Sequence, residues 1–297
     1  MVEHIIEKAA VLVEALPYIQ AFKDKIVVVK FGGSLMDAEH YVDSILRDVV
    51  FMHSVGMKPV IVHGGGDHIS DEMRRAGLTP RFVDGLRVTD AATIKVVERV
   101  LVQEINVLLQ QKVREFGVVP EGHSGRDFGI VRVRKFEPMV SEKPDTPPVA
   151  VDIGYVGRVE AIDAGPILSI LDNGRLPVIA SLGCGPGGEA YNVNADETAG
   201  EVAVALQAEK LVFLTDVRGI MRDPGDTNSL MTTLRLSEAE KLLENKAASG
   251  GMIPKLRACL KAVRNGVHKT HIIDGRLTHS LLLEIFTDKG VGTQLVP

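Results

Sequence analysis

The sequence contains no tryptophan, two cysteines and few aromatic residues. Because aromatics make up only 4% of the chain, the core must be built from aliphatic side chains. The two cysteines, Cys184 and Cys259, have neither a CxxC nor a metal-ligand spacing. They indicate small core residues in a reduced, cytoplasmic setting rather than a disulfide framework.

Long apolar runs and an excess of positive charge are also lacking. The first 20 residues carry Glu3, Glu7, Lys8 and Glu14, so they form neither a signal peptide nor a membrane span. A formal net charge of -5 argues against nucleic acid or an anionic membrane as a partner. A cytoplasmic protein is therefore expected, and any site for anions must use local cations.

What the sequence does contain begins with an amphipathic helix. Apolar residues recur at helical spacing in the N-terminal stretch, namely Ile5, Ile6, Ala9, Leu12, Val13, Leu16 and Ile19. Pro17 should kink or end this helix. Its apolar face is expected to pack on the body of the protein or on a partner subunit.

After this helix, apolar strands alternate with helices. Strands are predicted over 26–30, 58–66, 176–182, 210–217 and 269–275, and helices over about 38–54, 71–76, 91–116, 196–206 and 281–286. This alternation is typical of an α/β protein with a mainly parallel sheet covered on both faces. Residues 130–156 instead predict a β-hairpin excursion with a Pro-rich turn. At 297 residues, either one large domain or two lobes would be consistent with the length.

Segments that combine glycines with charged or polar residues follow four predicted strands, over residues 30–34, 63–67, 181–196 and 215–219. Ligands bind at the carboxyl ends of parallel strands, so these segments should converge on one crevice. Residues 183–188 match GxGxxG, but an internal proline and the lack of an immediate helix argue against dinucleotide binding. The P-loop order is also absent, since Lys30 precedes Gly32 and Gly33.

Phosphoryl transfer needs fixed positive charge and backbone N–H groups, and this chain offers both. Lys30 ends a strand beside two glycines, and Lys255 opens a predicted helix after a second glycine pair. Asp196 would suit a carboxylate that holds both lysines, although a solvated surface lysine is the ordinary alternative for each. His63 is expected to make a structural hydrogen bond. His268, His271 and His279 lack the further ligands of a zinc site, so no metal is expected on protein ligands alone.

Seven motifs occur in the order KFGG, VHGGG, GLRVTD, YNVNAD, LTDVRGI, SGGMIPK and HIIDGR. In this order they resemble the N-acetylglutamate kinases of the amino-acid kinase superfamily, over about residues 25–297. The resemblance implies the three-layer α/β/α fold of that superfamily, with a central, mainly parallel sheet. It also implies transfer of the ATP γ-phosphoryl to the γ-carboxylate of N-acetyl-L-glutamate, a step of arginine biosynthesis. No general base is needed, because the acceptor carboxylate is already ionised.

The resemblance also implies roles for individual residues. Lys30, Lys255 and Asp196 would form the catalytic centre. Substrate would meet Gly65, Gly66, Arg87, Asn192 and Asn194, with the guanidinium clamping the α-carboxylate. The nucleotide would meet Gly32, Gly33, Thr215, Asp216, Gly219, Asp223, Gly251 and Met252. Mg²⁺ would be held mainly by the phosphates of ATP and by water.

Some positions depart from the family pattern. Ser34 and Leu35 stand where Asn-Ala is frequent, His123 precedes an SGRD that is often SGKD, and Arg218 replaces a frequent proline. Each lies at the edge of a loop, so we expect effects on rates and affinities rather than on the reaction.

This chain resembles the family members that have a helix before the first strand. Those members tend to be hexamers, built as trimers of dimers, and L-arginine inhibits them. Residues 1–24 would then serve oligomerisation, and 25–297 would form the kinase domain, with an acyl-amino-acid lobe (about 25–180) and a nucleotide lobe (about 181–297). The arginine site would include Tyr18, Lys210, His271, Glu284 and Gly290, within or near the C-terminal segment 284–293. A nitrogen-signalling protein is a further candidate partner. The alternatives are another acid kinase of the superfamily and a catalytically weak arginine-sensing subunit.

Overall fold

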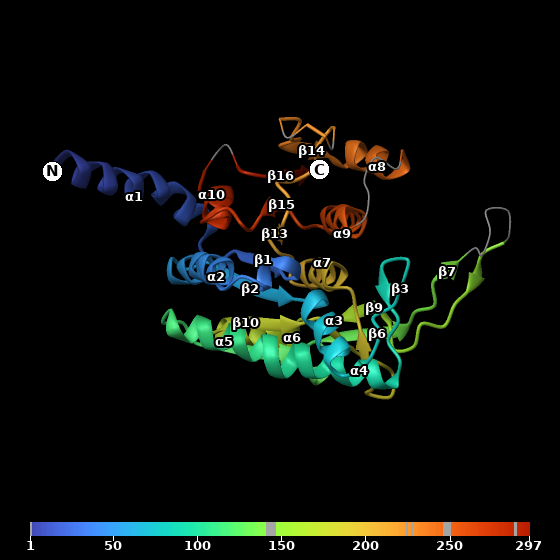
Figure 1. Ribbon diagram of the computed structural model, residues 1–297. Helices are drawn as coiled ribbons and strands as arrows, with labels where there is room; N and C mark the ends of the chain where they lie inside the picture. Colours follow the sequence, from blue (N-terminus) through green and yellow to red (C-terminus); the bar gives the residue numbers. More distant parts are fainter. Residues whose placement is uncertain (1, 141–146, 224, 227, 246–250, 288–289) are drawn as a thin grey trace.

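The computed structural model describes residues 2–140, 147–223, 225–226, 228–245, 251–287 and 290–297. Within residues 2–12 only the side chains of Ile6 and Ala10 are described. The chain forms three layers, in which helices cover both faces of one large sheet (Figure 1). The predicted α/β/α architecture is therefore confirmed.

The central sheet has eight strands, in the order β14-β16-β15-β13-β1-β2-β10-β5. All neighbouring pairs are parallel except β15 and β16. In this order the strands are β14 (Thr233–Arg235), β16 (Thr293–Val296), β15 (Lys269–Asp274), β13 (Lys210–Thr215), β1 (Ile26–Phe31), β2 (Lys58–His63), β10 (Leu176–Ala180) and β5 (Pro120–Ser124). The mainly parallel sheet predicted from the apolar strands is thus present.

Helices bury the two faces of this sheet in two separate hydrophobic clusters. On β1, Val27 and Val29 join one cluster and Val28 the other, because successive side chains point to opposite faces. The first cluster includes α2 (Glu39–Ser54), α3 (Gly66–Arg75), α4 (Ala91–Glu98), the π-helical η2 (Arg99–Ile105), α5 (Asn106–Glu115) and α10 (Ser280–Ile285). The second includes α6 (Gly165–Asp172), α7 (Ala195–Ala205), α8 (Leu236–Glu244) and α9 (Met252–Arg264).

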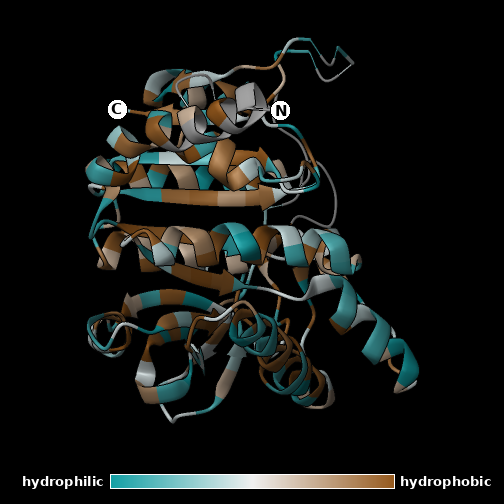
Figure 2. Ribbon diagram, turned by 90° about the vertical axis from the view of Figure 1, so that its left-hand side faces the viewer, coloured by the Kyte–Doolittle hydropathy of each residue, from teal (hydrophilic) through white to brown (hydrophobic). Residues whose placement is uncertain are grey.

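The core is aliphatic, as predicted. Phe31 and Phe213 are the aromatic side chains among its largest fully buried members. Figure 2 shows the strand arrows of the sheet coloured mostly as hydrophobic, as expected for strands buried on both faces. None of the helices in the described ranges is both long and apolar enough to cross a membrane.

A smaller sheet and a hairpin extend the body beside β10. The sheet has the order β12-β11-β6-β9, and its strands are β12 (Ala190–Asn192), β11 (Leu182–Cys184), β6 (Val131–Lys135) and β9 (Gly157–Ile162). β6 and β9 pair antiparallel, as do β7 (Met139–Val140) and β8 (Val149–Ala150). The predicted hairpin excursion is confirmed, while residues 141–146 of its Pro-rich turn lie outside the described residues.

Several predicted boundaries were wrong. α1 (Val2–Phe22) continues through Pro17, and it extends away from the body (Figure 1). Its carbonyl at Val13, which loses its hydrogen bond to the proline, lies on an exposed stretch where water can replace that bond. α3 begins at Gly66, directly after the glycine turn, and not near Asp71, because its polar first turn hides the helical period.

Two further elements are interrupted. The predicted strand 176–182 leaves the central sheet after Ala180, and Leu182 begins β11 in the smaller sheet. The long helix predicted over 91–116 contains the π-helical segment η2 between α4 and α5. A period averaged over such a length does not reveal one wider turn.

The remaining elements are short. They are the 3₁₀ helices η1 (Gly33–Met36) and η3 (Asp127–Gly129), and the hairpin formed by β3 (Phe82–Val83) and β4 (Leu86–Arg87). Both η1 and the β3–β4 hairpin border the crevice at the carboxyl ends of β1 and β2.

Phe213 at the centre of β13 gives a direct test of this core. Phe213→Ala should lower the free energy of unfolding by about 3–5 kcal/mol, because it removes a fully buried ring and leaves a cavity. Leu277→Ala, at a side chain that is 46% exposed, should cost less than about 1 kcal/mol. Urea unfolding at matched protein concentration measures both, and equal losses would contradict the core assignment.

Candidate active site

A buried carboxylate joins two lysines at the centre of the crevice. Lys30 Nζ lies 2.9 Å from Asp196 Oδ1, and Lys255 Nζ lies 3.0 Å from Asp196 Oδ2. Lys30 and Asp196 are buried, and Lys255 is partly buried at the start of α9. The three residues predicted as the catalytic centre are therefore brought together from β1, α7 and α9.

The first turn of α7 places Asp196. The side chain of Asn194 caps this helix and accepts hydrogen bonds from the N–H groups of Asp196 (2.9 Å) and Glu197 (3.1 Å). The carboxylate thus sits where the helix dipole favours negative charge. Burial raises the pKa of Asp196, but the nearby Lys30 and Lys255 outweigh this and leave it below its usual value. With Asp196 ionised, the cluster carries one net positive charge for an anionic ligand.

Two glycine turns meet beside the lysines. Gly32 has a φ of 156°, and a Cβ there would lie 3.3 Å from the backbone nitrogen of Gly64. A side chain at Gly32 would therefore push the two turns apart. In the second turn, the N–H groups of Gly65 and Gly66 have no hydrogen-bond partner among the described residues, and both glycines line the cavity.

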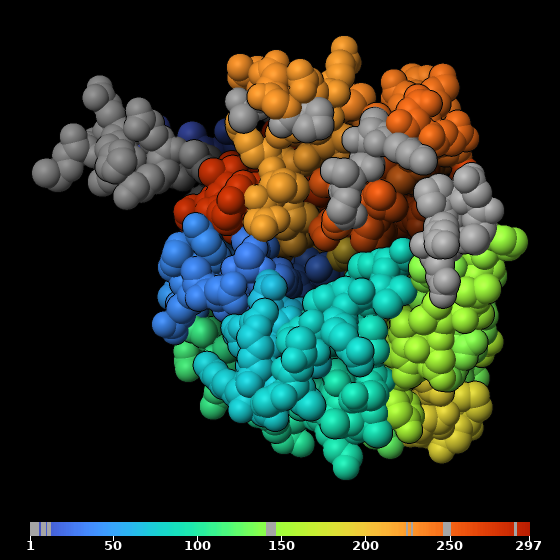
Figure 3. Space-filling model, turned by 45° about the vertical axis from the view of Figure 1, so that its right-hand side comes forward, coloured from blue at the N-terminus to red at the C-terminus, as the bar shows by residue number. Residues whose placement is uncertain are grey.

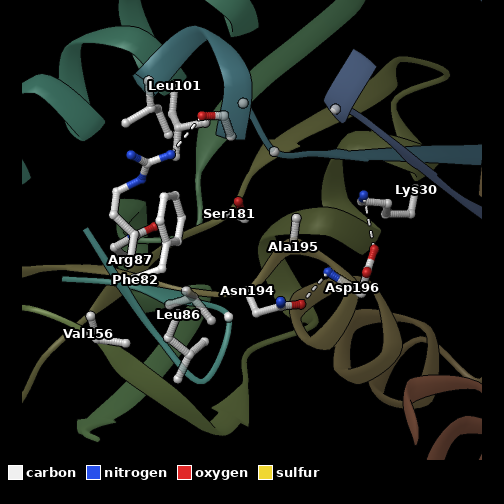
Figure 4. A pocket seen from close by; sticks show the side chains of 18 residues that line it. Lys30, Phe82, Leu86, Arg87, Leu101, Val156, Ser181, Asn194, Ala195 and Asp196 are labelled. Carbon is white, nitrogen blue, oxygen red and sulfur yellow. Dashed lines mark hydrogen bonds and ion pairs between the residues drawn. The ribbon is translucent and has the colours of Figure 1, made fainter. Parts of the chain in front are cut away.

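Arg87 lies on the opposite side of this cavity from Lys30 (Figure 4). Its Nη2 donates to Gly66 O at 2.7 Å and to Ser70 Oγ at 2.8 Å, and its guanidinium carbon lies 4.8 Å from the centre of the Phe82 ring. Burial lowers the pKa of Arg87, a shift that Asp67 opposes. The guanidinium is therefore held in one orientation at the cavity wall.

The cavity between these charges has a volume of about 250 Å³. It is lined by Lys30, Gly33, Gly64, Gly65, Gly66, Ile69, Phe82, Gly85, Leu86, Arg87, Leu101, Val156, Ser181, Asn192, Val193, Asn194, Ala195 and Asp196. The predicted substrate residues are all in this set. Asn192 Nδ2 donates to Thr89 Oγ1 at 3.2 Å, and Asn194 Oδ1 is used as the helix cap, so only part of each amide is left for a ligand.

Sequence reasoning missed several lining residues. Ser181 directly follows β10 and begins the strand-end segment 181–196 expected at the crevice, although it was not named as a site residue. Phe82 and Leu101 carried no signal, because a hairpin and the π-helical turn bring them to the cavity.

A second cavity, of about 910 Å³, adjoins the first and shares Gly85, Leu86, Asn194 and Asp196 with it. It lies between α7, the N-terminal part of α9 and the β3–β4 turn. Figure 3 shows the molecule hollowed between the C-terminal part of the chain, in orange, and the segment that contains this hairpin, in cyan.

The predicted nucleotide residues are less closely grouped. Gly251 lines the larger cavity and Gly33 the smaller one, whereas Gly32, Thr215, Asp216, Gly219, Asp223 and Met252 line neither. The loop after β13 is nevertheless tied to the first glycine turn, because Ser34 Oγ donates to Asp216 Oδ2 at 3.0 Å. Thr215 Oγ1 accepts from the N–H of Val217 at 3.0 Å and thereby shapes this loop.

The five predicted effector residues line one cavity of about 330 Å³. This cavity lies where α1 ends, beside the first residues of β13 and β15. His271 Nδ1 lies 2.7 Å from Glu284 Oε1, and Glu284 Oε2 accepts from the N–H groups of Val291 and Gly292. Burial raises the pKa of Glu284, but His271 and these two N–H groups outweigh it and hold the pKa below its usual value. Burial lowers the pKa of Lys210 to about 8.

Metal ligands and cysteines add little to these sites. In the ranges that the structure describes, no three His, Cys, Asp or Glu residues lie close enough to hold a metal ion. Cys259 is buried, as expected for a core residue, whereas Cys184 is only half-buried. The GxGxxG match at 183–188 begins in β11 and continues into the turn before β12, and the next helix, α7, begins only at Ala195.

A parallel sheet with glycine turns at its strand ends, a buried lysine on β1 and a second lysine at the start of α9 has the parts of an α/β enzyme of phosphoryl transfer. Residues 25–274 match the sequence model of the amino acid kinase family. The chain belongs to this amino acid kinase family.

One relative by sequence and two solved structures of another protein are similar to this chain over most of its length. The chain is 48% identical over 291 residues to the acetylglutamate kinase of Heliobacterium modesticaldum, with 98% of each chain covered. The solved N-acetylglutamate synthase of Neisseria gonorrhoeae, complexed with coenzyme A and N-acetyl-glutamate, is 27% identical with a TM-score of 0.81, over 97% of this chain and 63% of that one. The same synthase complexed with coenzyme A and L-arginine has a TM-score of 0.79 at 27% identity, over 97% and 65% of the two chains.

The glycine turn beside the lysines gives a matched pair of variants. In Gly65→Ala the new Cβ would lie 2.5 Å from Ile105 Cδ1 and 3.0 Å from Leu101 Cδ2, so the variant should lose about 1–3 kcal/mol of unfolding free energy. Gly66→Ala meets nothing within 4 Å and should lose much less. Urea unfolding compares them, and similar losses in both would show that η2 does not pack on the turn as described.

Proposed function

We propose that the chain transfers the γ-phosphoryl of ATP to the γ-carboxylate of N-acetyl-L-glutamate, a step of arginine biosynthesis. The observation that carries the proposal is a cavity with the fixed guanidinium of Arg87 on one side and Lys30 on the other, where Asp196 joins Lys30 to Lys255 in the adjoining cavity. The acetylglutamate kinase of Heliobacterium modesticaldum, to which this chain is 48% identical, supports the same reaction.

A dicarboxylate fits the two charged ends of the cavity. Arg87 would bind the α-carboxylate, and its hydrogen bonds to Gly66 O and Ser70 Oγ keep it oriented for this task. The γ-carboxylate would then lie toward Lys30, with the N–H groups of Gly65 and Gly66 and the amide of Asn192 beside it. Asn194 would contribute its Nδ2, which has no partner in the part of the chain that the structure describes, and the apolar side chains of the lining suit an acetyl methyl group.

The chemistry then depends on charge and position. The acceptor carboxylate is the nucleophile and is ionised at neutral pH, so no base is required. Lys30 and Lys255 would stabilise the charge of the transferring phosphoryl from two sides, and Asp196 holds both ammonium groups in place.

The nucleotide would approach from the larger cavity. Gly251 and Met252 stand at the start of α9, whose N–H groups favour phosphate, and Gly32 and Gly33 would contact it from the other side. Thr215, Asp216, Gly219 and Asp223 belong to the loop after β13 and would border the rest of the nucleotide. Both oxygens of Asp196 already face lysines, so Mg²⁺ would be held mainly by the phosphates and water, where it neutralises phosphate charge.

L-Arginine is the proposed effector. Glu284 would pair with its cationic group in the cavity that Tyr18, Lys210, His271 and Gly290 also line. The relative solved with L-arginine, the Neisseria synthase, makes this choice of ligand reasonable. Arginine would act by binding one arrangement of subunits more tightly than another.

Residues 1–24 would assemble the oligomer, a hexamer built as a trimer of dimers. α1 leaves the body and exposes Ile6, Val13 and Leu16, which a second subunit would cover. Residues 25–297 would form the kinase domain, with the acyl-amino-acid lobe over about 25–180 and the nucleotide lobe over about 181–297. The enzyme would act in the cytoplasm, where a nitrogen-signalling protein is a candidate partner.

The lysine pair is the first test of this function. Lys30→Ala and Lys255→Ala should each lower kcat by about 10²–10³-fold, because each removes a cation from the transition state. Lys58→Ala, at a solvent-exposed ion pair with Asp172, should leave kcat nearly unchanged.

ATP consumption measured with N-acetylglutamate, glutamate, aspartate and carbamate separates the alternatives. Turnover only with another acceptor would favour a different acid kinase, and negligible turnover with tight arginine binding would favour a sensing subunit. Near-normal kcat in either lysine variant would refute the catalytic role.

The N-terminal helix is tested by removing residues 1–24. Sedimentation should show dimers in place of hexamers, and arginine should no longer inhibit, because the helix proposed to join the subunits and Tyr18 are both gone. Within the full chain, Leu16→Asp should weaken the hexamer, whereas Glu14→Gln, at an exposed neighbour, should not. An unchanged hexamer after the deletion would exclude this role of α1.

A further inference from the structure

Most backbone polar atoms of the second glycine turn have hydrogen-bond partners, whereas the N–H groups of Gly65 and Gly66 have none among the described residues. His63 O accepts from the N–H of Ser181 at 3.1 Å, and the N–H of Gly64 donates to Phe31 O at 3.3 Å. Gly64 O lies 3.3 Å from the Nδ1 atom of His63. The next polar atom, the N–H of Gly65, has no partner among the described residues.

The carbonyl of Gly64 and the N–H of Gly65 belong to one peptide bond. This unit is planar and trans, so its oxygen and its hydrogen point in opposite directions. A donor that holds Gly64 O therefore also sets the direction of the Gly65 N–H. Since Gly64 and Gly65 are both glycines with wide backbone freedom, their own conformational preferences would not fix this plane.

The ring of His63 has only one arrangement of its proton that satisfies its neighbours. Asn106 Nδ2, which can only donate, lies 3.0 Å from His63 Nε2 and 3.0 Å from Val178 O. Val178 O can only accept, so it fixes which way the amide of Asn106 faces, and Asn106 Oδ1 then accepts from Gln110 Nε2 at 2.8 Å. His63 Nε2 is therefore the acceptor, and Nδ1 carries the hydrogen that is donated to Gly64 O.

Burial keeps this imidazole neutral. His63 is fully buried, and desolvation lowers its pKa to about 4. Asn106 is the first residue of α5, directly after η2, whose Leu101 and Ile105 pack on the other side of Gly65. One helix thus supports the turn by packing and also sets the proton of His63.

We propose that His63 is a positioning residue, whose Nδ1–H holds the Gly64–Gly65 peptide so that the Gly65 N–H points into the cavity toward the acceptor substrate. The proposal rests on the proposed function for the identity of that substrate. The competing role for His63 is a core residue that only fills space.

Two substitutions separate these roles. In His63→Asn the amide nitrogen can occupy the place of Nδ1 and still donate to Gly64 O, whereas in His63→Gln the polar group reaches toward the place of Nε2 and leaves Gly64 O without its donor. We expect KM for N-acetylglutamate to rise about tenfold or more in His63→Gln and less than about threefold in His63→Asn. KM for ATP should stay within about twofold in both. Thermal melts of both variants report the loss of packing separately.

A space-filling role predicts the opposite order, because asparagine leaves the larger void. Equal KM values in the two variants, or a greater rise in His63→Asn, would overturn the proposal. Asn106→Leu should behave like His63→Gln, since it frees the imidazole proton, while Gln110→Leu, one step further from the ring, should have a smaller effect.

A readout without substrate keeps the two hypotheses separate. In glycine-selectively ¹⁵N-labelled protein, the Gly65 amide resonance should be kept in His63→Asn and shifted or broadened in His63→Gln. If the wild-type protein does not use N-acetylglutamate but the two variants show this pattern of Gly65 resonances, the proposed function is refuted and the positioning role is kept. An unaltered Gly65 resonance in His63→Gln would refute the positioning role whatever the substrate.

Discussion

The site depends on one buried carboxylate that must stay ionised. Asp196 touches Lys30 with one oxygen and Lys255 with the other, and it joins the central strand β1 to two helices that cover the sheet. A buried charge with a missing partner is strongly destabilising, so the three residues constrain one another's positions. The helix cap at Asn194 positions Asp196, and the end of β1 positions Lys30. An anionic ligand would meet the net positive charge that remains on the cluster.

The second constraint is mechanical, and it couples the core to the crevice. Leu101 and Ile105 belong to the first hydrophobic cluster, yet they also determine how closely η2 approaches Gly65. Asn106 continues the same helix and reaches the buried His63. Packing and polar contacts therefore act on one glycine turn from two sides. A change made for stability in this part of the core would also change the shape of the cavity.

Much of the fold could be predicted because its signals are local. The continuous apolar strands β1, β2, β13 and β15 gave the parallel sheet, and their glycine-rich ends gave the position of the crevice. The wrong boundaries have separate causes. α1 passes through Pro17 on an exposed stretch, α3 starts at Gly66 with a polar first turn, and the strand that begins at Leu176 divides between two sheets. The π-helical η2 changes one turn only, which periodicity does not detect.

For the candidate site, the sequence by itself determined the residue types: Lys30 and several glycines at the ends of strands, and Asp196 and Lys255 at the starts of helices. Because parallel strands end at the same edge, their convergence also followed from the sequence. Only the tertiary structure decided which atoms meet. The sheet places β13 beside β1 and β2 beside β10, although these strands are far apart along the chain. Asn106 contacts both His63 and Val178 because β2 and β10 are neighbours in that order. Arg87, on the β3–β4 hairpin, contacts Ser70 on α3 in the same way across a tertiary contact that the local sequence does not reveal.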